Sequence, residues 1–112
     1  MIETLIAFTL LINAERNVDL KPDILLTIKA AERAEYLCTN KQWSHAGWMK
    51  SFEGLSYTYA GENLAKDFPS EKKAHEALMA SPSHKNNIMS PFYSKLGVAT
   101  GKCGITVQLF SN

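Results

Sequence analysis

The chain has 112 residues, of which 46% are hydrophobic and 21% are charged, and its formal net charge is +1. A chain of this length is expected to form a single domain over residues 1–112 and to bury roughly 65% of its unfolded surface. The composition excludes disordered and collagen-like proteins. Twelve basic and eleven acidic residues are scattered along the chain. No basic stripe is therefore present to bind a nucleic acid.

The chain begins with an apolar run, residues 5–12 (LIAFTLLI), that resembles the core of a signal peptide. Glu3 stands where a signal peptide carries Lys or Arg, and no small-x-small cleavage site follows. The run is also too short to span a bilayer. We therefore predict a deeply buried first helix over residues 2–16, covered on nearly all sides.

A second helix is predicted from Pro22, which suits a first helical turn, to a stop at Asn40. Helical spacing places Ile24, Ile28, Ala31, Ala34 and Cys38 on its buried face, and Lys29, Glu32, Arg33 and Glu35 on its exposed face. Residues 41–55 contain two tryptophans, one histidine and two glycines without a clean period. This pattern indicates a long ordered loop.

The second half of the chain alternates between strand and helix signals. Residues 56–59 predict a short strand that enters a turn at 61–63. Ser70 is expected to cap a helix with Ala74, Ala77 and Leu78 on its apolar stripe and His75 on its solvated face.

Ser81 and Pro82 predict the start of a short helix that ends near Met89 and carries His84 in its first turn. Alternating residues over 96–100 and 105–110 then predict a closing hairpin. The pattern as a whole favours an α+β, layered domain around a small, mostly antiparallel sheet.

The two cysteines, Cys38 and Cys103, are compatible with either redox state. A disulfide closing so long a loop would stabilise the fold by about 4 kcal/mol. Small secreted scaffolds that depend on disulfides usually carry more than two cysteines. We therefore predict free thiols.

Three residues form a candidate site: His45 and His84, which lie in loop-like sequence, and Glu62 between them. Two imidazoles and a carboxylate form a recognised set of ligands for a divalent metal, and zinc is the ion that we expect here. In that arrangement Glu62 is either the third ligand or a base that acts on a bound water.

Without a metal, Glu62 is a candidate general acid if a hydrophobic wall surrounds it. The residues expected to form this wall and the adjoining substrate groove are Trp43, Trp48, Tyr59 and Asn63. Structural roles compete with these functional ones, because His84 also suits a capping position, His45 a loop hydrogen bond and Glu62 a turn cap.

Six short motifs follow one another along nearly the whole chain. They are 30–34 (AAERA), 44–48 (SHAGW), 61–65 (GENLA), 81–89 (SPSHKNNIM), 92–98 (FYSKLGV) and 107–110 (VQLF). In this order they resemble the CAP superfamily (cysteine-rich secretory proteins, antigen 5, pathogenesis-related 1), whose modules are also called SCP domains. The likeness is greatest to the compact microbial or phage-like branch, which lacks additional disulfides.

The resemblance implies a three-layer α-β-α sandwich with a cleft lined by two histidines and two glutamates. His45 and His84 match the histidines, and Glu62 matches the first glutamate. The second glutamate is not matched, because its expected place near residues 79–81 holds Met, Ala and Ser, and Glu76 lies about one turn earlier.

The resemblance implies two classes of function. One is a monomeric, metal-binding hydrolase of a cell-envelope polymer, such as peptidoglycan during lysis, or of a peptide. The alternative is a non-catalytic module that binds a lipid, a sterol or a protein in the same cleft. Most members of the superfamily act outside the cell, although the missing signal peptide keeps a cytoplasmic location open.

Overall fold

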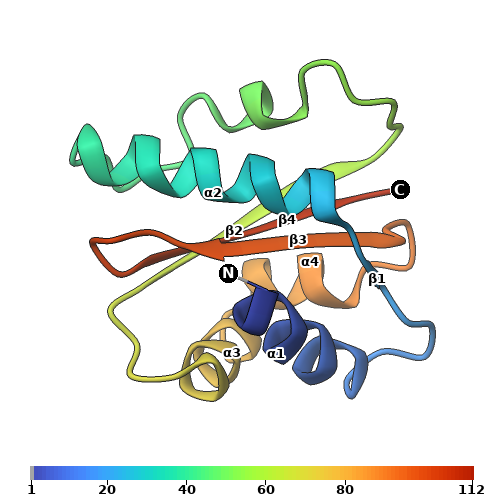
Figure 1. Cartoon of the computed structure of the whole chain (residues 1–112). Coiled ribbons are helices and arrows are strands. Elements are labelled where there is room, and N and C mark those ends of the chain that lie inside the picture. Colours follow the sequence, from blue (N-terminus) through green and yellow to red (C-terminus); the bar gives the residue numbers. More distant parts are fainter. Residues whose placement is uncertain (1) are drawn as a thin grey trace.

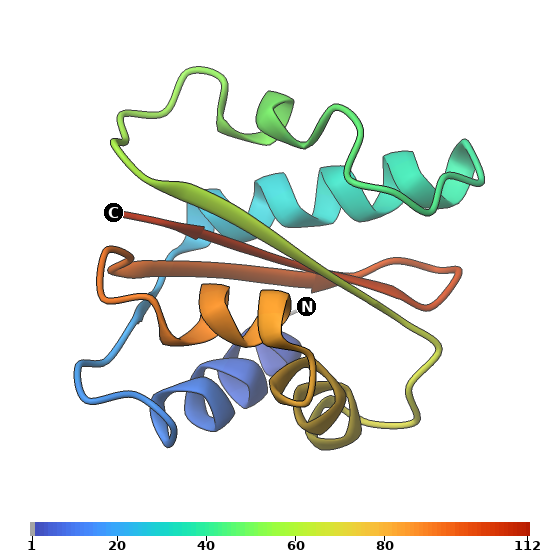
Figure 2. The ribbon, with the colours of Figure 1, turned by 180° about the vertical axis from the view of Figure 1, so that it is seen from behind.

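A four-stranded sheet forms the middle layer of the computed structural model, which describes residues 2–112. Its strands are β1 (Lys21–Pro22), β2 (Ala60–Lys66), β3 (Lys95–Thr100) and β4 (Ile105–Ser111), in the spatial order β1-β3-β4-β2. β4 pairs antiparallel with both β3 and β2, and only the short β1 is parallel to its neighbour. The sheet is therefore mostly antiparallel, as predicted, and β2 is an edge strand (Figure 2).

Helices cover both faces of this sheet (Figure 1). One face carries α2 (Ile24–Thr39) and the short 3-10 helix η1 (Trp48–Phe52). The other face carries α1 (Ile2–Asn13), α3 (Glu71–Met79) and α4 (Pro82–Met89). The predicted three-layer α-β-α sandwich is thus confirmed. Over residues 2–112, each helix is too short or too polar to cross a membrane.

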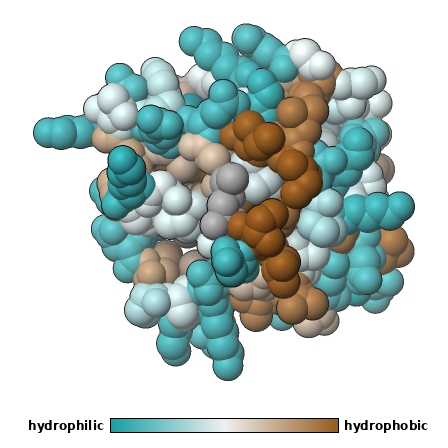
Figure 3. Space-filling view, viewed as in Figure 1, coloured by the Kyte–Doolittle hydropathy of each residue, from teal (hydrophilic) through white to brown (hydrophobic). Residues whose placement is uncertain are grey.

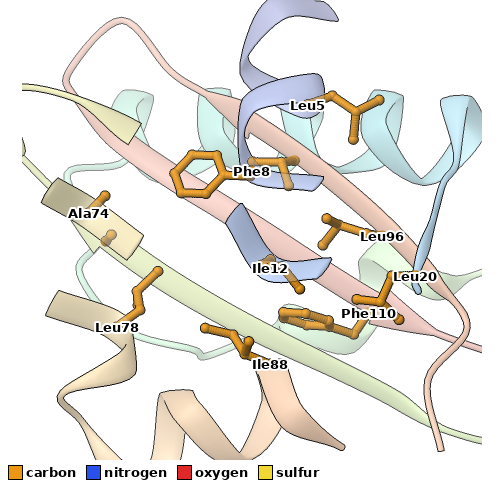
Figure 4. Close-up of a cluster of buried hydrophobic side chains, with 11 residues drawn as sticks. Leu5, Phe8, Ile12, Leu20, Ala74, Leu78, Ile88, Leu96 and Phe110 are labelled. Atoms are coloured by element: carbon orange, nitrogen blue, oxygen red, sulfur yellow. The ribbon is translucent and has the colours of Figure 1, made fainter. Parts of the chain in front are cut away.

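Each face of the sheet has its own apolar core, because successive strand residues point to opposite faces. The core under α1, α3 and α4 contains Leu5, Phe8, Ile12, Leu20, Ala65, Ala74, Leu78, Ile88, Leu96, Val98 and Phe110 (Figure 4). The core under α2 contains Leu26, Ala30, Ala34, Leu37, Phe52, Leu64, Ala99, Ile105, Val107 and Leu109. At Gly97, an added Cβ would lie 2.3 Å from the Leu26 carbonyl carbon, so α2 contacts β3 directly there.

The first helix is shorter and less covered than predicted. α1 ends at Asn13 and buries Leu5, Phe8 and Ile12, but Leu10 is 69% exposed. Ile2, Ile6 and three residues of α2 (Ile24, Leu25 and Ile28) are also exposed. The side of the molecule seen in Figure 1, where the edges of both helical layers are visible, accordingly shows a band of apolar side chains (Figure 3). The reason is that α1 lies in an outer layer and only one of its faces meets the sheet.

The second helix buries a different face from the one predicted. Pro22 belongs to β1, and Asp23 is the N-cap, with its side chain accepting a hydrogen bond from the Leu26 amide. The residues buried are Leu26, Thr27, Ala30, Arg33, Ala34 and Leu37. Apolar residues occur on both sides of α2, so spacing alone did not decide which face meets the sheet. The predicted stop at Asn40 is confirmed as the C-cap.

The remaining predictions for secondary structure differ from the observed structure in one place. Residues 56–59 are irregular, and β2 begins at Ala60, so the motif predicted as a turn lies inside a strand. Seven register pairs with β4, from Ala60–Ser111 to Lys66–Ile105, hold it there. The Ser70 cap, the helix from Pro82 to Met89 and the closing hairpin are confirmed, and the 41–55 loop contains η1.

His75 is buried, not solvated as predicted, with only 4% of its surface exposed. Its Nε2 atom lies 3.6 Å from Glu15 Oε1, and neither ring nitrogen has a hydrogen-bond partner within residues 2–112. α3 turns this position toward α1 because Ala74, His75 and Leu78 share the face that meets the core.

The prediction of free thiols is wrong. Cys38 at the end of α2 and Cys103 in the β3–β4 turn form a disulfide across a sequence separation of 65 residues. The two Cα atoms lie 5.6 Å apart because α2 packs along β3 and β4.

Reduction of this disulfide is expected to lower the free energy of unfolding by about 4 kcal/mol, because the unfolded chain regains the entropy of the closed loop. Urea unfolding of the oxidised and reduced protein measures the effect. A Cys38→Ala and Cys103→Ala double variant should match the reduced protein. Equal unfolding midpoints in all three samples would contradict this assignment.

Candidate functional site

The candidate site straddles the edge strand β2. Leu64 packs into the core under α2 and Ala65 into the core under α1, so Glu62 points toward α2 and Asn63 toward α4. His45 precedes η1 on the α2 face, and His84 lies in the first turn of α4 on the other face. The edge strand brings groups from the two helical layers together.

Glu62 is held by a buried ion pair. Its Oε2 accepts a hydrogen bond from Arg33 Nε at 2.8 Å, and its Oε1 lies 3.4 Å from Arg33 Nη2. The same Oε1 lies 2.8 Å from His45 Nδ1. The side chains of Arg33 and Glu62 are 5% and 1% exposed, whereas that of His45 is 52% exposed.

This geometry leaves His45, and not Glu62, as the side chain that is accessible at the surface of the site. The Arg33 guanidinium and the His45 ring contact both carboxylate oxygens, so Glu62 holds the His45 ring in place. A carboxylate accepts the hydrogen bond from Nδ1–H, and neutral His45 then carries its lone pair on Nε2. Nε2 has no hydrogen-bond partner within residues 2–112.

A second polar network lies under the site on the other face of β2. Asn63 is completely buried and donates to the His84 carbonyl and to Gln108 Oε1, both at 3.1 Å. Asn87 Nδ2 donates to Asn63 Oδ1 at 2.9 Å and to the Glu62 carbonyl at 3.2 Å. Asn63 therefore supports the site from below and does not line a groove, contrary to the prediction.

Gly61 is the point of closest approach in this network. An added Cβ would lie 2.5 Å from the Tyr93 hydroxyl oxygen and 3.0 Å from Asn87 Oδ1. The Tyr93 hydroxyl donates to the Ala60 carbonyl at 3.1 Å. Any side chain at position 61 would push these two groups away from the edge of β2.

Two adjoining hollows meet at His45, and we call them together the His45 cleft. The first, of about 240 Å³, is lined by His45, Trp48, Ala60, Gly61, Glu62 and Asn87. The second, of about 220 Å³, is lined by Trp43, Ser44, His45, Leu64 and His84. Trp48 and Trp43 each line one of these hollows, whereas Tyr59 lines neither and stacks on Phe92 with ring centroids 4.7 Å apart.

His45 and His84 are brought together, as predicted. Partial burial lowers the pKa of His84, and the nearby charge of His45 lowers it further. Both effects disfavour a second positive charge in the cleft.

The donor set does not fit a three-ligand zinc site. Zinc in a catalytic site takes three protein ligands and one open position. Glu62 is committed to Arg33 and His45, and Glu76 is exposed on α3 in an ion pair with Lys73. No group of three His, Cys, Asp or Glu side chains within residues 2–112 is arranged to hold a metal ion. The two imidazoles remain as the possible ligands.

Arg33 and Asn87 are the site residues that the sequence interpretation missed. Arg33 follows Leu26 and Ala30 on the face that meets the sheet, and this was the available signal. Asn87 falls three residues after His84, one turn along α4, but amide side chains are common on helix surfaces and give no signal alone.

Replacing Arg33 with Met should lower the free energy of unfolding by about 3–5 kcal/mol, because Glu62 would stay buried without its partner. Chemical denaturation measures this change. The Arg33→Met and Glu62→Leu double variant should recover most of the loss, since both charges are removed. Glu32→Met, an exposed neighbour on α2, is the control and should change stability by about 0.5 kcal/mol or less.

The imidazole of His84 should titrate below the ordinary value of 6.5, with its pKa followed by NMR. His45→Ala should raise this pKa only in part, because desolvation is the larger cause. Since folded His84 binds its proton less readily than unfolded His84, its contribution to stability is present above pH 6.5 and is lost as the pH falls below that value. A His84 pKa at or above 6.5 in the wild type would contradict this.

Comparison with known proteins identifies related chains. Residues 14–110 match the model of the cysteine-rich secretory protein family, CAP. Protein YkwD of Bacillus subtilis (strain 168), itself uncharacterized, is 33% identical over 106 residues, which cover 84% of this chain and 41% of YkwD. The chain thus spans less than half the length of that relative.

Solved structures share the fold. An extracellular SCP-domain protein of Bacillus anthracis aligns over all of this chain and 40% of its own, with a TM-score of 0.85 at 18% identity. An outer surface protein of Borrelia burgdorferi aligns over 96% of this chain and 88% of its own, with a TM-score of 0.80 at 24% identity. These structures share the fold, and the family match over residues 14–110 shows that the chain belongs to the cysteine-rich secretory protein family, CAP.

Proposed function

We propose that this domain acts outside the cytoplasm and binds a peptide or cell-envelope polymer in the His45 cleft. The observation that carries the proposal is the half-exposed His45 ring, held by a buried ion pair between hollows that contain Trp43 and Trp48. A fixed imidazole can hydrogen-bond a polar group of a ligand, and the aromatic side chains beside it can pack against flat groups. This combination favours an extended chain in which polar and flat groups alternate. The extracellular and outer-surface relatives support the location.

The division of the cleft into two small hollows favours a peptide or sugar over a sterol. The two hollows, of about 240 and 220 Å³, are each smaller than the range of roughly 300–1,000 Å³ typical of pockets that enclose a drug-sized molecule. A short side chain or a single sugar unit fits each hollow, whereas a whole sterol would remain largely exposed. A lipid- or sterol-binding module is therefore the weaker form of this proposal.

Hydrolysis is the second candidate, and the Glu62–His45 contact favours it. Neutral His45 would take a proton through Nε2 from a water molecule that attacks a peptide or ester carbonyl, and would return that proton to the leaving group. Glu62 would stabilise the imidazolium that forms. An ordinary glycosidase mechanism has less support, because it needs two carboxyl groups at the cleft and Glu62 is already committed.

A divalent ion held by His45 Nε2 and His84 is compatible with the two imidazoles, but no step of this proposal depends on it. When bound, such an ion would supply positive charge for an anionic group of the ligand. Because only two protein ligands are at hand, we expect zinc to bind in the micromolar range or more weakly. Calorimetry with zinc, repeated on His45→Ala and His84→Ala, measures this affinity.

Binding to purified insoluble peptidoglycan tests the first proposal in a co-sedimentation assay. Trp43→Ala and His45→Ala should each weaken binding about tenfold, the size of effect expected for a residue at the centre of an interface. Phe68→Ala, an exposed aromatic outside the cleft, is the matched control and should bind as the wild type does. Binding that survives both cleft substitutions would overturn the proposal.

Turnover separates the two candidates. Release of soluble fragments from peptidoglycan or from a peptide library would support hydrolysis if His45→Ala abolishes it and Glu62→Gln reduces it. Fragments released equally by the wild type and His45→Ala would point to a contaminant. Binding without release would leave the domain as a recognition module.

A further inference from the structure

A separate hollow lies on the outer side of Arg33, between α2 and η1, and we call it the α2–η1 pocket. It has a volume of about 220 Å³ and is lined by Lys29, Glu32, Arg33, Tyr36, Gly47, Lys50 and Ser51. It shares no lining residue with the His45 cleft. Arg33 nevertheless connects the two places, because its guanidinium holds Glu62 on the inner side.

The sequence places basic groups on both walls of this pocket. Lys29, Arg33 and Tyr36 follow at i, i+4 and i+7, which puts them on one stripe of α2. Lys50 comes from η1 on the opposite wall. Gly47 precedes η1 with φ +79, a conformation that favours glycine, and a Cβ there would lie 4.0 Å from Arg33 Nη1. Arg33 Nη1 is therefore close to the turn that borders the pocket.

The donors of this pocket are not used elsewhere in the part of the chain that the structure describes. Arg33 directs Nε and Nη2 to Glu62 and to the Ser44 carbonyl, while Nη1 donates no hydrogen bond within residues 2–112. Lys29 and Lys50 form no ion pair within the same range. Glu32 is the acidic side chain of the lining, and Glu62 already balances Arg33, so the remaining charge of the pocket is positive.

We propose that the α2–η1 pocket binds an oxyanion, a phosphate or carboxylate group, carried on an aromatic or apolar body. The charged oxygens of the ligand would accept charge-assisted hydrogen bonds from Arg33 Nη1, Lys29 and Lys50. Tyr36, which is 50% exposed, would pack against the body of the ligand. Because Arg33 is nine-tenths or more buried and fixed by Glu62, its donor is positioned before the ligand arrives.

Two probes test the proposal by NMR titration of the whole chain at constant ionic strength and about pH 7, where phosphate is anionic. Inorganic phosphate should shift the backbone amides of Gly47 and Ser51 saturably, with a Kd of about 1 mM for so small an anion. Phenyl phosphate should bind several-fold more tightly if Tyr36 contacts the ring. Equal affinities would assign the pocket to the free anion and would overturn the part of the proposal that requires an aromatic body.

Matched charge variants distinguish binding in the α2–η1 pocket from a general attraction of the anion to the positive charge of the protein. Lys29→Met with Lys50→Met should weaken phenyl phosphate binding at least tenfold, while Lys72→Met with Lys102→Met, which removes the same charge elsewhere, should leave it unchanged. Non-saturable shifts, or equal weakening in both double variants, would overturn the proposal. Such a failure would not affect the His45 cleft, because His45→Ala retains the whole α2–η1 pocket.

Discussion

The buried ion pair between Arg33 and Glu62 is the constraint on which the site depends. Removing both charges from water costs several kcal/mol for each ion, and only close contact with good geometry offsets that cost. The pair therefore fixes the rotation of α2, the register of β2 and the position of the His45 loop relative to one another. A slip of one residue in β2 would turn Glu62 to the other face of the sheet and leave Arg33 buried without a partner.

The other face of β2 is fixed by hydrogen bonds in place of charge. Asn63 donates to Gln108 and accepts from Asn87, and Asn87 also donates to the carbonyl of Glu62 at the strand edge. Gln108 Nε2 is left without a partner within residues 2–112. The network still favours this arrangement, because breaking any of its bonds would leave further buried polar groups without a partner. At the outer edge of β2, Tyr93 and Asn87 thus bond to the Ala60 and Glu62 carbonyls, which would otherwise be open to pairing with another strand.

Local signals in the sequence predicted the parts of the fold that depend on local chemistry. The Ser70 cap, proline at the start of α4 and the closing hairpin were all predicted. The sequence also predicted that His45 and His84 lie close together, and both line one hollow of the cleft. Arg33 was missed because a charged helical residue normally points to solvent, and only the distant Glu62 reverses that preference. The disulfide depends likewise on the packing of α2 along β3 and β4, a contact that cysteine counting does not reveal.

The unmatched second glutamate is consistent with what the first one does here. A carboxylate pair can divide acid and base roles only if one member is free to hold or release a proton. Glu62 is locked between a guanidinium and an imidazole, so a second carboxylate in the cleft would add negative charge without a free partner. The arrangement of Arg33, Glu62 and His45 instead leaves Nε2 of the half-exposed His45 ring without a hydrogen-bond partner within residues 2–112. It is this atom that the ligand proposed for the His45 cleft would meet, beside Trp43 and Trp48, which line the two hollows.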